Sequence, residues 1–198
     1  MNNPAQPNAG VHGKPKQNDA YSLSNFRILI VEDYPFMADL IATMLREFGV
    51  GNIVMANSGS EAKEMLVMLN TDPGSRNHID MIVTDWLMPD GDGTDLLDWI
   101  RGHKKDTVKF IPVILCSAYT SEEVVEIGRD HGANEVLVKP VSAKKLASRL
   151  LHMIDHPRPF IKAPDFFGPD RRRKVEPFDG EDKRKMKPEE IKESHERI

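Results

Sequence analysis

The feature that most constrains this chain is a fivefold alternation between short apolar runs and longer segments whose apolar residues have helical spacing. Each run is bounded by turn-forming residues. The runs span residues 26–31, 50–56, 79–84, 110–117 and 135–138. Continuous apolar runs of this kind are typical of strands that are buried on both faces. The alternation therefore predicts an α/β fold, in which helices cover both sides of a parallel sheet.

The segments between the runs carry apolar residues three and four positions apart, the spacing of a helix packed on a sheet. In residues 37–48 the stripe consists of Met37, Leu40, Ile41, Met44, Leu45 and Phe48. Residues 60–69, 94–103, 121–132 and 142–154 have similar patterns. Short polar residues, which often cap the first backbone amides of a helix, stand at four of the expected starts. They are Ser58, Thr94, Ser121 and Ser142.

The two ends of the chain depart from this pattern. Residues 1–24 are rich in Asn, Pro, Gly and Gln and have no apolar periodicity, so we predict a flexible arm. Residues 25–156 contain all five units and are predicted to form one folded domain. Residues 157–198 are charged and interrupted by proline, and they have too few apolar residues for a second core. We predict a mostly disordered tail there.

Composition limits the classes of partner. A formal net charge of −4 gives no overall attraction to nucleic acid or to an anionic membrane. The apolar runs are far shorter than the roughly 20 residues that a membrane helix needs. The only cysteine, Cys116, cannot form an intramolecular disulfide, and the chain does not start with a signal-peptide pattern. We therefore expect a soluble, cytoplasmic protein without a membrane partner.

Polar side chains follow the carboxyl ends of four of the five predicted strands. They are Glu32 and Asp33 after the first, Asp85 after the third, Ser117 at the fourth and Lys139 after the fifth. In an open parallel sheet, the functional crevice lies at these ends. One acidic turn by itself is usually only solvated. Three carboxylates, a hydroxyl and a lysine at the same edge indicate a site.

Three carboxylates packed together repel one another, and a proton or a cation must relieve that repulsion. Oxygen ligands without His or Cys favour Mg²⁺ or Mn²⁺. Such a site suits phosphoryl chemistry, because the metal neutralises phosphate oxygens while a carboxylate becomes an aspartyl phosphate. Lys139 would supply a second positive charge.

The chain resembles the receiver domain of two-component response regulators in four motifs: VED (31–33), DWLMPDGDG (85–93), CSA (116–118) and VKP (138–140). The resemblance covers residues 26–155. It implies a doubly wound, flavodoxin-like sheet of strand order 2-1-3-4-5. It also implies that Asp85 accepts a phosphoryl group from a histidine kinase or a histidine phosphotransfer protein, in a chain that is not a turnover enzyme.

The resemblance assigns ligands to the metal. Asp33, Asp85 and the backbone carbonyl of Leu87 would bind Mg²⁺ directly, and Glu32 would assist through water. By contrast, we predict that Asp90 and Asp92 are solvated loop charges rather than ligands. Trp86, next to Asp85, should report metal or phosphate binding by its fluorescence.

Two further residues acquire roles from the resemblance. Ser117 would be the switch hydroxyl that moves to the phosphoryl group, and Lys139 would pair with it. Many family members carry an aromatic residue where this chain has Val136, so Tyr119 is our alternative gate on the same face. Leu87 cannot orient an attacking water, which predicts a long-lived phosphoryl group.

Other functions were weighed. A Mg²⁺-dependent aspartyl-phosphate hydrolase would place a second Asp where this chain has Leu87, and Glu32-Asp33 would repel the phosphate of a bound flavin mononucleotide. The tail stretch FFGPDRRRKV (166–175) suits docking to an acidic partner, or a nucleic-acid-binding effector. Nearby acidic residues largely cancel its charge and argue against nucleic acid. We expect signalling through protein contacts, with a downstream protein target.

Overall fold

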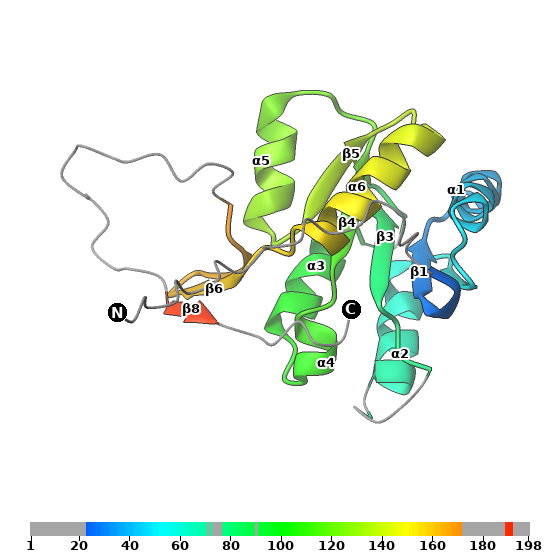
Figure 1. The fold of residues 1–198 in the computed structure, drawn as a ribbon. Coiled ribbons are helices and arrows are strands. Elements are labelled where there is room, and N and C mark those ends of the chain that lie inside the picture. Colours follow the sequence, from blue (N-terminus) through cyan, green and yellow to red (C-terminus); the bar gives the residue numbers. More distant parts are fainter. Residues whose placement is uncertain (1–22, 71, 73–76, 90, 172–188, 192–198) are drawn as a thin grey trace, which may run out of the picture.

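The computed structural model describes residues 23–70, 72, 77–89, 91–171 and 189–191 (Figure 1). Most of the predicted N-terminal arm lies outside the described residues. Its last two residues open a 3-10 helix, η1 (Leu23–Asn25), and Leu23 is buried against the hydrophobic core. Within the described ranges, no helix has both the length and the apolar character needed to cross a membrane.

Five parallel strands form the central sheet, in the order β2-β1-β3-β4-β5 (Figure 1). They are β1 (Arg27–Val31), β2 (Asn52–Ala56), β3 (Met81–Asp85), β4 (Val113–Ser117) and β5 (Glu135–Val138). The three central strands, β1, β3 and β4, are buried along almost their whole length. Burial on both faces is what continuous apolar runs indicate. The predicted doubly wound, flavodoxin-like α/β fold is therefore confirmed.

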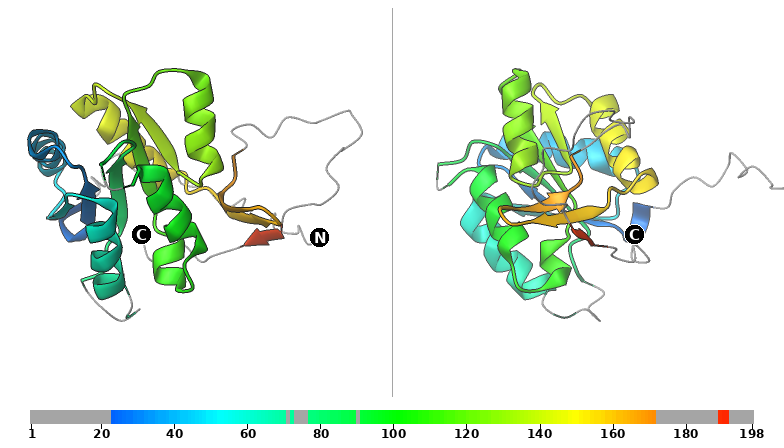
Figure 2. Two further views of the ribbon diagram at one scale, coloured as in Figure 1. Left: turned by 180° about the vertical axis from the view of Figure 1, so that it is seen from behind. Right: turned by 90° about the vertical axis from the view of Figure 1, so that its left-hand side faces the viewer.

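Helices cover both faces of this sheet (Figures 1 and 2). They are α1 (Pro35–Glu47), α2 (Gly59–Asn70), α3 (Gly93–Gly102), α5 (Glu122–Asp130) and α6 (Ala143–Asp155). Alternate residues of one strand point to opposite faces, so Ile28 packs with α1 and α6, and Leu29 packs with α2 and α3. A one-turn helix before β4, α4 (Asp106–Lys109), was not predicted.

Three of the four predicted helix caps are present. The side chains of Ser58, Ser121 and Ser142 each accept a hydrogen bond from the backbone N–H three residues later, at 3.2, 3.4 and 3.3 Å. Each serine therefore satisfies one amide that the helix itself leaves without a partner.

The cap of α3 is Asp92 and not the predicted Thr94. Asp92 Oδ1 accepts hydrogen bonds from the backbone N–H groups of Thr94 and Asp95, at 2.9 and 2.8 Å. The Asp92 amide in turn donates a hydrogen bond to the Asp95 carboxylate, which completes a capping box. The prediction that Asp92 is only a solvated loop charge was therefore wrong, because its carboxylate closes the helix end. Asp90 lies outside the described residues.

Part of the predicted disordered tail is a β-hairpin. Strands β6 (Phe160–Ala163) and β7 (Phe166–Pro169) pair in antiparallel fashion, and β8 (Glu189–Ile191) pairs with the other edge of β6. Phe160 and Ile161 are buried. The expectation of disorder thus does not hold for this segment, because its apolar side chains pack against the domain of the five-stranded sheet instead of forming a core of their own.

Candidate functional site

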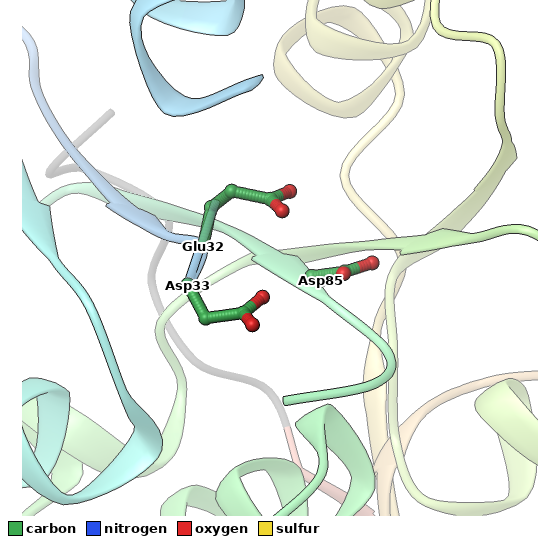
Figure 3. A group of neighbouring side chains, drawn as sticks. All are labelled: Glu32, Asp33 and Asp85. Atoms are coloured by element: carbon green, nitrogen blue, oxygen red, sulfur yellow. The ribbon is translucent and has the colours of Figure 1, made fainter. Parts of the chain in front are cut away.

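The candidate site lies at the carboxyl ends of β1 and β3, which are neighbours in the sheet. Glu32 and Asp33 directly follow β1, and Asp85 is the last residue of β3. One carboxylate oxygen from each of the three lies within 4.8 Å of the others. Figure 3 shows all three side chains pointing into the same space. Glu32 is buried, Asp85 is partly buried and Asp33 is exposed, so the cluster opens to solvent on one side.

Lys139 reaches this cluster from the far side of β4. It follows β5, and its Nζ donates to Asp85 Oδ1 at 2.8 Å and to Glu32 Oε2 at 3.0 Å. The Lys139 amide donates to the Ser117 carbonyl at 2.7 Å, which extends the pairing of β5 with β4 to the lysine. The Lys139–Pro140 peptide bond is cis. The structure therefore brings together three carboxylates and one ammonium group from three strand ends.

Burial and the neighbouring charged groups shift two pKa values in the site. Burial raises the pKa of the Glu32 carboxyl; the hydrogen bond from Lys139 opposes this, and repulsion from Asp85 and Asp33 adds to it. Burial alone would lower the pKa of Lys139, but its hydrogen bonds to Asp85 and Glu32 outweigh that effect and the pKa is raised. Lys139 is consequently held as a cation. Ionisation of Glu32 is made less favourable by burial and by the neighbouring carboxylates.

The two oxygens of Asp85 differ in their contacts. Oδ1 accepts hydrogen bonds from the Trp86 amide at 2.8 Å and from Lys139. Oδ2 accepts none from the part of the chain that the structure describes. The carboxylate is thus oriented through one oxygen while the other stays available for chemistry.

A tight turn after Asp85 keeps the loop close to the strand end. The Gly93 amide donates to the Trp86 carbonyl at 2.7 Å. A Cβ added to Gly93 would stand 2.2 Å from the Asp85 carbonyl oxygen, so only glycine fits at this crossing. Leu87 lies in this turn and is 51% exposed.

Ser117 ends β4, the strand next to β3, and it is fully buried. Its Oγ accepts a hydrogen bond from the Tyr119 amide at 3.0 Å. Tyr119 is 53% exposed, and Val136 is buried under α5. The predicted switch hydroxyl therefore bonds to its own loop in this arrangement.

Metal ligation fits the donor set of the site. The three carboxylates offer oxygen atoms only, with unequal burial and one open side. Hard divalent cations prefer oxygen ligands, and Mg²⁺ usually keeps several waters when one or two carboxylates bind it. Glu32, Asp33 and Asp85 therefore suit such an ion.

Sequence reasoning missed two groups that shape the site: the Trp86 amide, which orients Asp85, and Gly93, which lets the loop cross it. The two glycines of DWLMPDGDG were read only as turn residues. A close approach of backbone to backbone leaves no pattern in a single sequence beyond the glycine itself.

Comparison with known proteins finds relatives of the part of the chain that contains this site. Residues 28–151 match the response regulator receiver domain family. The chain is 33% identical over 126 residues to chemotaxis protein CheY-3 of Vibrio cholerae, covering 64% of this chain and 89% of that protein. It is 32% identical over 124 residues to chemotaxis protein CheY of Pseudomonas aeruginosa, covering 63% of this chain and 92% of that protein.

Similar solved structures come from the same family as these relatives. The non-phosphorylated HemR receiver domain of Leptospira biflexa has a TM-score of 0.54 and 28% identity, covering 68% of this chain and 98% of that one. A chain of the CheX–CheY–BeF3–Mg²⁺ complex of Borrelia burgdorferi has a TM-score of 0.55 and 28% identity, covering 65% and 89%. The sequence-based identification is thereby confirmed. This chain belongs to the family of response regulator receiver domains.

Proposed function

We propose that Asp85 is the phosphoryl acceptor of this receiver, and that a histidine kinase or a histidine phosphotransfer protein is the donor. The arrangement of Asp85 carries the proposal. Its Oδ1 is fixed by Lys139 and the Trp86 amide, and its Oδ2 accepts no hydrogen bond from the described residues. A carboxylate that is oriented but not fully engaged suits a nucleophile.

In the proposed step, an oxygen of the Asp85 carboxylate bonds to phosphorus while the P–N bond of the donor phosphohistidine breaks. The bonding electrons leave with the histidine nitrogen, which takes up a proton. Mg²⁺, when bound to Glu32, Asp33, Asp85 and the Leu87 carbonyl, would neutralise charge on the phosphoryl oxygens. The similar structure solved with BeF3 and Mg²⁺ supports this choice of metal.

Lys139 and Ser117 respond to the new group in this proposal. Lys139 gives up its bond to Asp85 Oδ1 and pairs with a phosphoryl oxygen. The Ser117 hydroxyl leaves the Tyr119 amide and donates to another phosphoryl oxygen. These exchanges favour a second arrangement of the face formed by α5, β5 and α6, and the phosphoryl group stabilises that arrangement without creating it. Tyr119 would gate this face, since Val136 lacks an aromatic ring.

The proposal extends to the organisation of the protein. The signalling unit comprises residues 25–156, acts in the cytoplasm, and signals through contacts with a protein target. It accepts and loses a phosphoryl group without turning over a substrate. A fluorescent fusion tests the location, and capture of a target only in the presence of the phosphodonor tests the output.

Incubation with Mg²⁺ and acetyl phosphate tests the acceptor directly. The wild type should gain one phosphoryl group, seen by mass spectrometry and lost in alkali. Asp85→Asn should gain none. Asp39→Asn, which changes an exposed carboxylate on α1, is the matched control and should behave as the wild type. Equal labelling of Asp85→Asn would refute the assignment of Asp85, and no labelling of the wild type would refute the function.

A further inference from the structure

The strongest unexplained feature is the segment 158–171, which we call the C-terminal hairpin and which lies beyond the family match. It packs against the domain through an aromatic cluster. The ring of Phe110 lies 4.9 Å from that of Phe160 and 5.2 Å from that of Phe167, and Lys109 stands 4.0 Å above Phe167. Phe160 is 3% exposed. These aromatic contacts stabilise the packing of the hairpin against the domain.

The hairpin also contacts the end of α5. Arg171 forms an ion pair with Asp130, the last residue of that helix. A Cβ added to Gly168 would lie 3.0 Å from the Cα of Gly132, so the hairpin backbone presses on the turn that follows α5. Figure 2 shows the hairpin beside this end of the helix.

A buried arginine links these contacts. Arg101 donates from Nε to the Gly132 carbonyl at 2.9 Å and from Nη2 to Asn134 Oδ1 at 3.0 Å. Its guanidinium also lies 5.0 Å from the centroid of the Phe160 ring. The position of the hairpin and the position of the turn after α5 are thus fixed by the same side chain.

The start of β5 is held in the same way. Glu135, the first residue of β5, is 2% exposed and pairs with Arg158 of the hairpin segment at 2.9 Å. Arg149 of α6 approaches the same carboxylate at 3.4 Å. The hairpin segment therefore touches α5, β5 and, through Glu135, α6, the three elements proposed to rearrange.

The same helix also faces the phosphoryl site. A Cβ added to Gly128 of α5 would lie 2.9 Å from Val136 and 3.4 Å from the Trp86 ring. The Trp86 amide donates a hydrogen bond to Asp85 Oδ1. The last turn of α5, which contains Gly128 and Asp130, therefore lies between a neighbour of Asp85 and the docking site of the hairpin. It has little free space at either contact, so a shift of this turn on one side is transmitted to the other.

We propose that docking of the C-terminal hairpin is coupled to the state of Asp85: the hairpin is held in the arrangement without a phosphoryl group and loosens when the phosphoryl group is present. The proposal rests on the proposed function. Coupling between two sites is reciprocal: if the phosphoryl group weakens docking of the hairpin by a given factor, complete undocking strengthens binding at Asp85 by up to that factor. The hairpin is then an output element of this receiver, in addition to the face of α5, β5 and α6.

Hydrogen exchange of the full chain tests the coupling. Beryllofluoride with Mg²⁺ serves as the probe, and tryptophan fluorescence reports whether it binds. Bound probe should speed exchange of the amides in residues 160–169 by about fivefold or more, in the usual range of coupling between sites. Amides of β1 should not change. Fluorescence that reports binding, with hairpin exchange unchanged or slower, overturns the coupling alone. Lack of binding overturns the proposed function as well.

A variant provides the reverse measurement. Gly168→Val places a branched side chain against Gly132 and should undock the hairpin without altering any residue of the site. We expect its dissociation constant for beryllofluoride to fall about fivefold. Lys162→Val, at an exposed position of the same hairpin, is the matched control and should leave the constant unchanged. Equal constants for the two variants would overturn the proposal.

Discussion

Replacement of Lys139 by methionine should destabilise the protein mainly through the carboxylates that lose their partner. Lys139 Nζ is 2.8 Å from Asp85 and 3.0 Å from Glu32, and its side chain is 18% exposed. At an effective dielectric constant of about 20, each contact corresponds to about 6 kcal/mol of gross attraction, most of which offsets desolvation. Removing one partner of a buried pair costs about 3–5 kcal/mol. Because solvent reaches one side, we expect a loss of about 2–4 kcal/mol in the free energy of unfolding.

The pH dependence of this loss follows from the two pKa shifts. The raised pKa of Lys139 means that its stabilisation is complete below 10.5 and is lost as pH rises through the folded-state pKa. Without Lys139, the pKa of Glu32 rises further, because the hydrogen bond that opposes burial is gone. A carboxyl whose pKa is raised by folding destabilises the fold when it ionises. The deficit of Lys139→Met should therefore be larger at pH 7 than near pH 4.5, the ordinary pKa of glutamate.

Urea unfolding followed by tryptophan fluorescence, in buffer with EDTA, measures this deficit. Lys144→Met on the exposed side of α6 is the matched control. Added Mg²⁺ should recover more stability in Lys139→Met than in the control, because it supplies a missing positive charge. A difference from the control below about 0.5 kcal/mol at pH 7, the usual scatter for surface substitutions, would refute the reasoning.

Three further predictions concern single side chains. Asp92→Ala should lower the free energy of unfolding by about 1 kcal/mol in urea titrations, because α3 loses its cap. A loss no larger than that of an exposed Asp39→Ala variant would contradict this. Burial raises the pKa of the Cys116 thiol to about 12, so iodoacetamide at pH 8 should alkylate it in urea but not in the native protein; rapid native labelling would exclude this. Leu87→Asn should shorten the lifetime of the phosphorylated protein, since a polar side chain at this exposed position can orient water. An unchanged lifetime would show that Leu87 does not limit hydrolysis.

The local sequence was sufficient for the sheet and for the elements of the site. Continuous apolar runs that alternate with helical segments indicate strands buried between two helical layers, and the polar residues that end such strands gather at one edge of a parallel sheet. For this reason Glu32, Asp33, Asp85 and Lys139 could be grouped before any coordinates were considered. The strand order came from the resemblance, because periodicity alone does not say which strands are neighbours.

The C-terminal hairpin shows what local patterns do not contain. The Ala163–Phe166 stretch has a Pro-Asp turn between apolar residues, which is a hairpin signal, but a hairpin alone is marginal in water. Its stability comes from Phe110 and Arg101, which are distant in the sequence.

The sequence by itself determined the parallel sheet, its helical layers and the gathering of charged groups at one edge, because each follows from short-range periodicity. Only the tertiary structure decided which oxygen of Asp85 is engaged, that Gly93 must be glycine, and that the chain beyond residue 157 returns to pack at the end of α5. Those features depend on contacts between segments far apart in the chain. Their energies belong to pairs of surfaces, and no single segment carries them.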